Sequence, residues 1–122
     1  MLHGLFESGP HGWHVVDRSD TDWFDIEVVD PRTLVPLDRA LILDSVRRTG
    51  RLVVADETNL SCGIASELSA IVAEHGFKSL RAPVLRVTRP DIPAPFSKPL
   101  EDAITPTVER ICAAVRQVVT WN

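Results

Sequence analysis

The chain has 122 residues, of which 44% are hydrophobic and 25% are charged, and its formal net charge is −4 at pH 7. This length supports one compact core but not two, and the composition is typical of a folded globular protein rather than a disordered one. The negative charge argues against nucleic acid as a partner because nucleic-acid binders need a basic surface, and the sequence has no run of 18 apolar residues that would span a membrane.

The first 24 residues show no helical or strand periodicity. We expect them to form an irregular segment that precedes a domain at residues 25–122. His11 and His14 form an H-x-x-H pair, but two imidazoles do not complete a zinc site, so we expect no bound metal. The start of the chain lacks the basic flank and the long apolar stretch of a signal peptide, and we therefore expect a cytoplasmic protein.

From residue 24 onward, strand and helix patterns alternate. Residues 24–29 alternate apolar and polar side chains and end at Asp30 and Pro31, which predicts a half-buried strand. Residues 37–48 carry a broad apolar surface and are followed by Gly50, which predicts a helix packed on a sheet. Residues 51–55 are a short apolar run with a β-branched centre, which predicts a buried parallel strand.

The second half of the chain continues the alternation. Residues 63–75 place apolar side chains at helical spacing before Gly76, and residues 84–88 predict another strand. Five prolines between residues 90 and 106 predict an extended surface loop. Thr105 and Pro106 have the residue types that begin a helix, and a buried apolar stripe follows them to residue 119.

Strands separated by helices of this length predict an α/β fold, with a mainly parallel sheet between two helical layers. In such a three-layer α/β/α domain, ligands bind at the carboxyl ends of the strands. Asp56 and Glu57 follow one predicted strand, and Asp91 follows the next. Adjacent side chains of a strand point in different directions, so Asp56 and Glu57 do not make a convincing acid–base pair.

Other catalytic patterns are missing from the sequence. It contains neither a G-x-G-x-x-G nor a G-x-x-x-x-G-K-[ST] phosphate loop, and no G-x-S-x-G nucleophile turn. We therefore expect no catalytic residue and no cofactor-binding residue in this chain.

The order of short motifs resembles one known family. Residues 49–57 (TGRLVVADE) and 63–67 (GIASE) resemble the transketolase C-terminal domain. The later motifs APV (82–84), RV (86–87), DIP (91–93) and LE (100–101) are similar in order and spacing to the β subunit of pyruvate and branched-chain 2-oxo acid dehydrogenases, the decarboxylating component. Upstream, residues 27–34 (EVVDPRTL) fit as well, so that the resemblance covers about residues 25–119.

The resemblance implies a subunit of an α2β2 enzyme that decarboxylates a 2-oxo acid on thiamine diphosphate and Mg²⁺. In such an enzyme this domain supports association of the β subunits and docking of a lipoyl acyltransferase, while other domains contact the cofactor. The implied partners are a second copy of the chain, the α subunit, a pyrimidine-binding domain and the acyltransferase. Within this interpretation, Gly63, Asp91, Pro93 and Phe96 are the candidate interface residues.

The chain also departs from the family pattern. We expect both a pyrimidine-binding domain before the matched region and the first strand–helix unit of the C-terminal domain to be missing. Our first hypothesis is therefore a non-catalytic association domain, or a split or truncated β subunit. The alternatives are a free-standing enzyme or small-ligand binder that uses Asp56 and Glu57, and a remnant without function.

Overall fold

The structure is a computed structural model, and it describes residues 6–9, 12–15 and 25–122. The chain divides into two compact units, Met1–Ser45 and Val46–Asn122.

The first unit contains a short hairpin. Strands β1 (Phe6–Gly9) and β2 (Gly12–Val15) pair in antiparallel fashion, with Phe6 opposite Val15 and Gly9 opposite Gly12. This hairpin lies within the segment that we expected to be irregular. The division of the chain at residue 24 stays a prediction.

The strand predicted at residues 24–29 is wrong in its described part. Residue 24 lies outside the described residues, and residues 25–29 belong to no strand. An alternating pattern forms a strand only where a neighbouring strand pairs with its backbone, and the described residues place none there. Leu34 and Leu37 instead form an isolated bridge around a cis Val35–Pro36 bond.

Helix α1 (Arg39–Thr49) follows and crosses the boundary between the units. The Asp38 carboxylate accepts a hydrogen bond of 3.0 Å from the Leu41 backbone N–H, and so caps the first turn of α1. Gly50, with φ +73°, ends the helix in a conformation that suits glycine.

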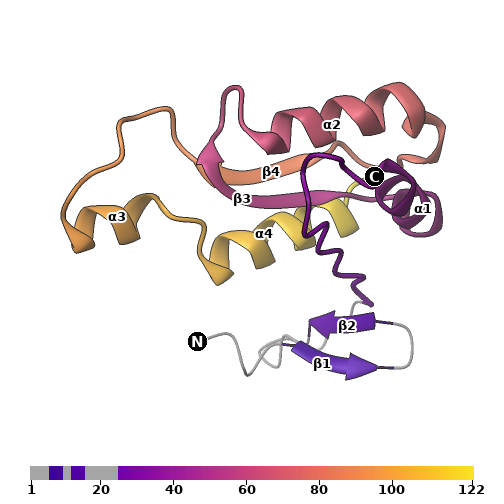
Figure 1. Cartoon of the computed structure of the whole chain (residues 1–122). Coiled ribbons are helices and arrows are strands. Elements are labelled where there is room, and N and C mark those ends of the chain that lie inside the picture. The colour runs from indigo at the N-terminus through magenta and orange to yellow at the C-terminus, as the bar shows by residue number, and fades with distance from the viewer. Residues whose placement is uncertain (1–5, 10–11, 16–24) are drawn as a thin grey trace. The chain divides into compact units, whose positions relative to one another are not determined.

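The second unit is built on two parallel strands, β3 (Val53–Asn59) and β4 (Leu85–Arg89). Helix α2 (Ile64–His75) packs on one face of the strands and helix α4 (Val108–Val119) on the other (Figure 1). This arrangement confirms the predicted α/β fold with three layers. The buried side chains of this unit come from every layer and are Val46, Val54, Ala65, Ile71, Val72, Ala82, Val87, Thr88 and Val118.

The start of β3 is tied to the end of α4. The Arg51 guanidinium donates from Nε to the carbonyl oxygen of Val118 at 2.7 Å and from Nη2 to that of Val119 at 3.4 Å. These carbonyls lie in the last turn of α4, where intrahelical donors run out and a cation is favourable. Arg51 therefore holds one helical layer on the sheet.

The proline-rich segment differs from the extended loop that we expected. A short helix, α3 (Lys98–Ile104), forms inside it. Pro99 lies in the first turn of α3, where a missing backbone N–H breaks no helical bond, so this proline does not prevent the helix.

The cap of α4 also differs from the prediction. The residue that caps α4 is Thr107, whose hydroxyl accepts a 3.3 Å bond from the Arg110 backbone N–H. Thr105 instead ends α3, where its hydroxyl donates to the Glu101 carbonyl oxygen at 2.8 Å. A threonine caps a helix only if the chain turns into the helix directly after it, and here α3 extends up to Thr105.

Candidate functional site

The carboxyl ends of β3 and β4 meet at an irregular place in the sheet. Ala55 pairs with Val87, but the next pair is Asn59 with Arg89. Three residues of β3 therefore lie opposite the single residue Thr88 of β4, and the strand bulges. The two candidate carboxylates Asp56 and Glu57 are in this bulge rather than beyond the strand end, because β3 is longer than the predicted strand.

The bulge places the two carboxylates in different environments. Asp56 is half-buried and accepts a hydrogen bond from the Thr58 hydroxyl, whereas Glu57 is exposed. No hydrogen bond joins Asp56 to Glu57. Their role as a ligand site stays a prediction, and the geometry supplies no acid–base pair to support it.

Directly after β3 the chain makes a tight turn into α2. Cys62 has φ +60°, and Gly63 is the N-cap of the helix. A Cβ atom added to Gly63 would lie 2.2 Å from Thr58 Oγ1 and 2.4 Å from the Asn59 carbonyl oxygen. Glycine is required here because the chain packs against itself; a role of Gly63 at a subunit interface stays a prediction.

Asp91 joins this turn to the segment after β4. Its carboxylate accepts bonds from the Ser61 backbone N–H at 2.8 Å and from the Ser61 hydroxyl at 2.6 Å. These two bonds, with a smaller contribution from the positive charge of Arg86, lower the pKa of Asp91 below its ordinary value of 3.8. The structure thus gives Asp91 a local role in joining the ends of two strands.

Arg86, on β4, reaches toward the same turn. Its Nη1 donates to the Leu60 carbonyl oxygen at 2.9 Å and to the Ser66 hydroxyl at 2.7 Å. The Leu60 backbone N–H in turn donates to the Arg89 carbonyl oxygen at 2.9 Å. These bonds fix the β3–α2 turn against the end of β4.

Two further arginines lie close to the end of β4. Arg110, in the first turn of α4, donates from Nη2 to the Thr88 carbonyl oxygen at 2.8 Å. The side chain of Arg89 is only 18% exposed and pairs with the Glu101 carboxylate of α3 at 3.7 Å. Its Nε is buried without a hydrogen-bond partner in the described part of the chain, a condition that costs about 1–3 kcal/mol.

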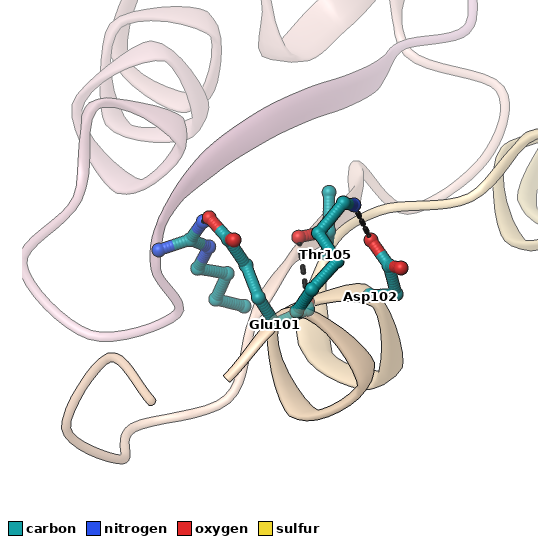
Figure 2. A network of polar contacts seen from close by, with 5 residues as sticks. Glu101, Asp102 and Thr105 are labelled. Atoms are coloured by element: carbon teal, nitrogen blue, oxygen red, sulfur yellow. Dashed lines mark hydrogen bonds and ion pairs between the residues drawn. The ribbon is translucent and has the colours of Figure 1, made fainter. Parts of the chain in front are cut away.

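The three arginines border one open pocket of about 380 Å³. The pocket lies between the ends of the strands and helices α3 and α4, and its wall consists of Leu60, Arg86, Thr88, Arg89, Pro90, Ala103, Ile104 and Arg110. On α3, Glu101 and Asp102 project to different sides of the helix (Figure 2). Asp102 accepts a hydrogen bond from Lys98, whereas Glu101 contacts Arg89 of the pocket.

The candidate interface residues of the proline-rich segment are exposed. Phe96 has a relative exposure of 109%, so its ring does not pin the segment to the rest of this chain. Pro93 and Asp91 are exposed as well, and Ile92 and Leu100 add further exposed apolar side chains. Their role at a subunit interface stays a prediction.

The sequence patterns did not indicate the arginine pocket. Arg86, Arg89 and Arg110 are separated by up to 24 positions, and the overall charge of the chain is negative. One local signal was present: Arg110 is a cation in the first turn of a helix, where the helix dipole disfavours positive charge. An arginine at this place is less unfavourable if its side chain interacts with a group outside its own helix.

Comparison with known proteins assigns this α/β/α chain to a family of domains. The family model "Transketolase, C-terminal domain" matches residues 14–111. The chain therefore belongs to the transketolase C-terminal domain family, as its motifs predicted.

Three of the similar curated proteins are β subunits. The chain is 49% identical over 96 residues to the pyruvate dehydrogenase E1 component subunit beta of Leifsonia xyli, covering 79% of this chain and 28% of that protein. It is 43% identical over 95 residues to the acetoin:2,6-dichlorophenolindophenol oxidoreductase subunit beta of Bacillus subtilis, covering 78% and 28%. It is 42% identical over 101 residues to the 2-oxoisovalerate dehydrogenase subunit beta of Pseudomonas aeruginosa, covering 83% and 28%.

A solved structure gives the same fold. A split-gene transketolase, described as an inactive β4 tetramer, matches with a TM-score of 0.57 and 29% identity over 71% of this chain and 27% of that chain. The chain thus spans less than a third of the relatives that it matches. The names of these relatives give different substrates. One name gives acetoin, and another gives pyruvate, one of the 2-oxo acids that the motifs suggested.

The described residues offer no cluster of side chains for the Mg²⁺ that accompanies thiamine diphosphate. Mg²⁺ needs oxygen ligands, and the described part of the chain contains no group of three or more His, Cys, Asp or Glu side chains that could hold a metal ion. Among the described residues, no helix is long and apolar enough to cross a membrane.

Proposed function

We propose that this chain is a non-catalytic association module of a thiamine-diphosphate-dependent 2-oxo acid dehydrogenase. In this proposal it acts as the C-terminal part of a β subunit, and the cofactor with Mg²⁺ is bound elsewhere in the assembly. The observation that carries the proposal is the row of exposed apolar side chains that runs from the segment after β4 into α3. These side chains are Ile92 at 45% exposure, Phe96 at 109% and Leu100 at 59%.

Such a row is costly in water and favourable at an interface. Burial of one large apolar side chain contributes about 1.5–3 kcal/mol, and aromatic side chains are common among the residues that dominate binding energies. The segment that carries the row extends beyond the ends of both strands (Figure 1). It is therefore accessible to another polypeptide without rearrangement of the sheet.

The neighbouring chemistry supports association over catalysis. Asp56 bonds to Thr58 and Asp91 bonds to Ser61, so both carboxylates serve local structure. The partners that we propose are a second copy of the chain, the α subunit, a β-subunit pyrimidine-binding domain and the lipoyl acyltransferase. One of the matched folds is itself described as a β4 tetramer.

Sedimentation velocity on the purified chain tests the proposal. We expect association that grows with protein concentration and that Phe96→Ser weakens by about tenfold or more, the effect of removing one anchor. Phe77→Ser is the matched control, because Phe77 is also exposed, at 71%, but precedes β4 rather than following it. Equal effects of the two substitutions would contradict the assignment of the surface.

Co-expression extends the test to the other partners. The chain should copurify with dehydrogenase subunits encoded in neighbouring reading frames, and Phe96→Ser should reduce the yield of that complex. A chain that stays monomeric at every concentration and copurifies with none of these subunits would refute the proposal. Turnover of a substrate by the purified chain, abolished by Glu57→Gln or Asp91→Asn, would refute its non-catalytic part.

A further inference from the structure

The open pocket between the strand ends and helices α3 and α4 has a chemistry that the association role does not use. Three of its wall residues are arginines, namely Arg86, Arg89 and Arg110. The pocket lies at the carboxyl end of parallel strands, where α/β folds bind ligands. Two of the arginines come from β4 and the third comes from α4.

The positive charges exceed the nearby negative ones. Glu101 contacts Arg89, and Arg86 is close enough to Asp91 to lower the pKa of that carboxyl. No ion pair joins Arg110 to a carboxylate within the described residues, and its side chain donates only to the backbone oxygens of Thr88 and Thr105. Three cations therefore stand beside two carboxylates, and the pocket keeps a net positive charge.

Arg89 brings to the pocket wall a guanidinium with one unsatisfied donor. It lines the pocket, its side chain is mostly buried, and its Nε–H has no hydrogen-bond partner among the described residues. A buried donor without an acceptor is destabilising. An oxyanion is the acceptor that guanidinium groups bind most strongly, because the donors of the guanidinium match its oxygens in geometry and charge.

We propose that this pocket binds the carboxylate or phosphate group of a small molecule, through Arg89 and Arg110. The volume of about 380 Å³ is that of a small-ligand pocket. Leu60, Pro90 and Ile104 provide apolar walls beside the arginines. The pocket therefore suits a small organic anion, with an apolar body next to its charged group.

Titration of the ¹⁵N-labelled full chain tests the proposal. Sodium phosphate and sodium acetate serve as probes at constant ionic strength, followed by the resonances of the Arg89 Nε–H and of the Thr88 and Arg89 backbone amides. We expect saturable shifts with at least one probe. Stronger binding of phosphate assigns a phosphoryl ligand, and stronger binding of acetate assigns a carboxylate ligand.

Variants separate the pocket from general charge attraction. Arg110→Gln and Arg89→Gln should each weaken binding by about tenfold or more, the effect of a lost charge-assisted bond. The control is Lys78→Gln, which removes one positive charge from an exposed side chain of the 3₁₀ helix Phe77–Ser79, before β4. It should change binding by less than about twofold. Because Arg89 is mostly buried, Arg110→Gln at an exposed position is the decisive variant if Arg89→Gln unfolds the chain.

Three results would overturn the inference. The first is the absence of saturable shifts with both probes, and the second is equal weakening by Lys78→Gln and Arg110→Gln. The third is binding of a poly-glutamate peptide without binding of either small ion, which would assign the pocket to an acidic segment of another chain. Loss of self-association leaves these readouts in place, so the pocket and the association surface are tested separately.

Discussion

Replacement of Gly63 by alanine is the sharpest perturbation of the turn that joins β3 to α2. The added Cβ would lie 2.2 Å from Thr58 Oγ1 and 2.4 Å from the Asn59 carbonyl oxygen, whereas real contacts of this kind are essentially never under 3.0 Å. The backbone must therefore move by at least 0.6 Å, the difference between 3.0 and 2.4 Å. Such overpacking against a backbone atom costs about 3 kcal/mol.

Urea denaturation followed by circular dichroism measures this cost. For a slope of about 2 kcal/mol per M, a loss of about 3 kcal/mol lowers the urea midpoint by about 1.5 M. Thr58→Ala in the Gly63→Ala background should recover part of the loss, because it removes the hydroxyl but leaves the Asn59 carbonyl in place. The stability of the double variant thus shows how much of the cost comes from the Thr58 side chain and how much from the Asn59 carbonyl.

Gly50→Ala is the comparison. At Gly50 a Cβ would approach only the flexible Arg81 side chain, at 2.9 Å, and the main cost is the φ of +73°. That conformation costs about 1 kcal/mol for a residue with a side chain. If Gly63→Ala is no less stable than Gly50→Ala, or lies within about 0.5 kcal/mol of the original chain, the close approach at Gly63 is refuted.

Three further outcomes follow from the packing and the hydrogen bonds of the second unit. Val72→Ala should lower the free energy of unfolding by about 2 kcal/mol because this side chain is fully buried, while Val35→Ala at 91% exposure should leave it nearly unchanged. Arg51→Gln should cost about 1–3 kcal/mol in the same assay because it breaks the bonds to the last carbonyls of α4. Ser61→Ala should raise the pKa of Asp91, followed by carboxyl NMR, since the Ser61 bonds lower that pKa. The lowered pKa of Asp91 stabilises the folded chain above pH 3.8, and this effect is lost as the pH falls through the pKa of the folded state. Ser61→Ala should therefore make the free energy of unfolding depend less steeply on pH in the acid range. An unchanged pKa of Asp91 or an unchanged pH dependence would contradict this.

Some elements were predictable because their signals are local. The apolar run at residues 51–55, the helical spacing at 63–75 and the run at 84–88 correspond to β3, α2 and β4. Each pattern depends on side chains within one turn or a few strand positions. The order of these motifs also carried the family, which the comparisons confirm over residues 14–111.

Other features depend on which segments meet in space. Residues 25–29 have the alternation of a strand but no pairing partner among the described residues. Thr107 caps α4 in place of Thr105 because α3 extends to that point, and Pro99 is compatible with α3 because it lies in the first turn. The role of each residue was decided by the path of the chain around it.

The candidate sites show most clearly which features the sequence determines and which features depend on the tertiary structure. The sequence alone indicated the family through the resemblance of its motifs, and local spacing predicted β3, α2 and β4. Only the tertiary structure brought Arg86 and Arg89 of β4 together with Arg110 of α4, and left the Arg89 Nε–H without an acceptor. Electrostatic and hydrogen-bonding environments depend on distances of a few ångströms between residues far apart in the chain, and no local pattern encodes those distances.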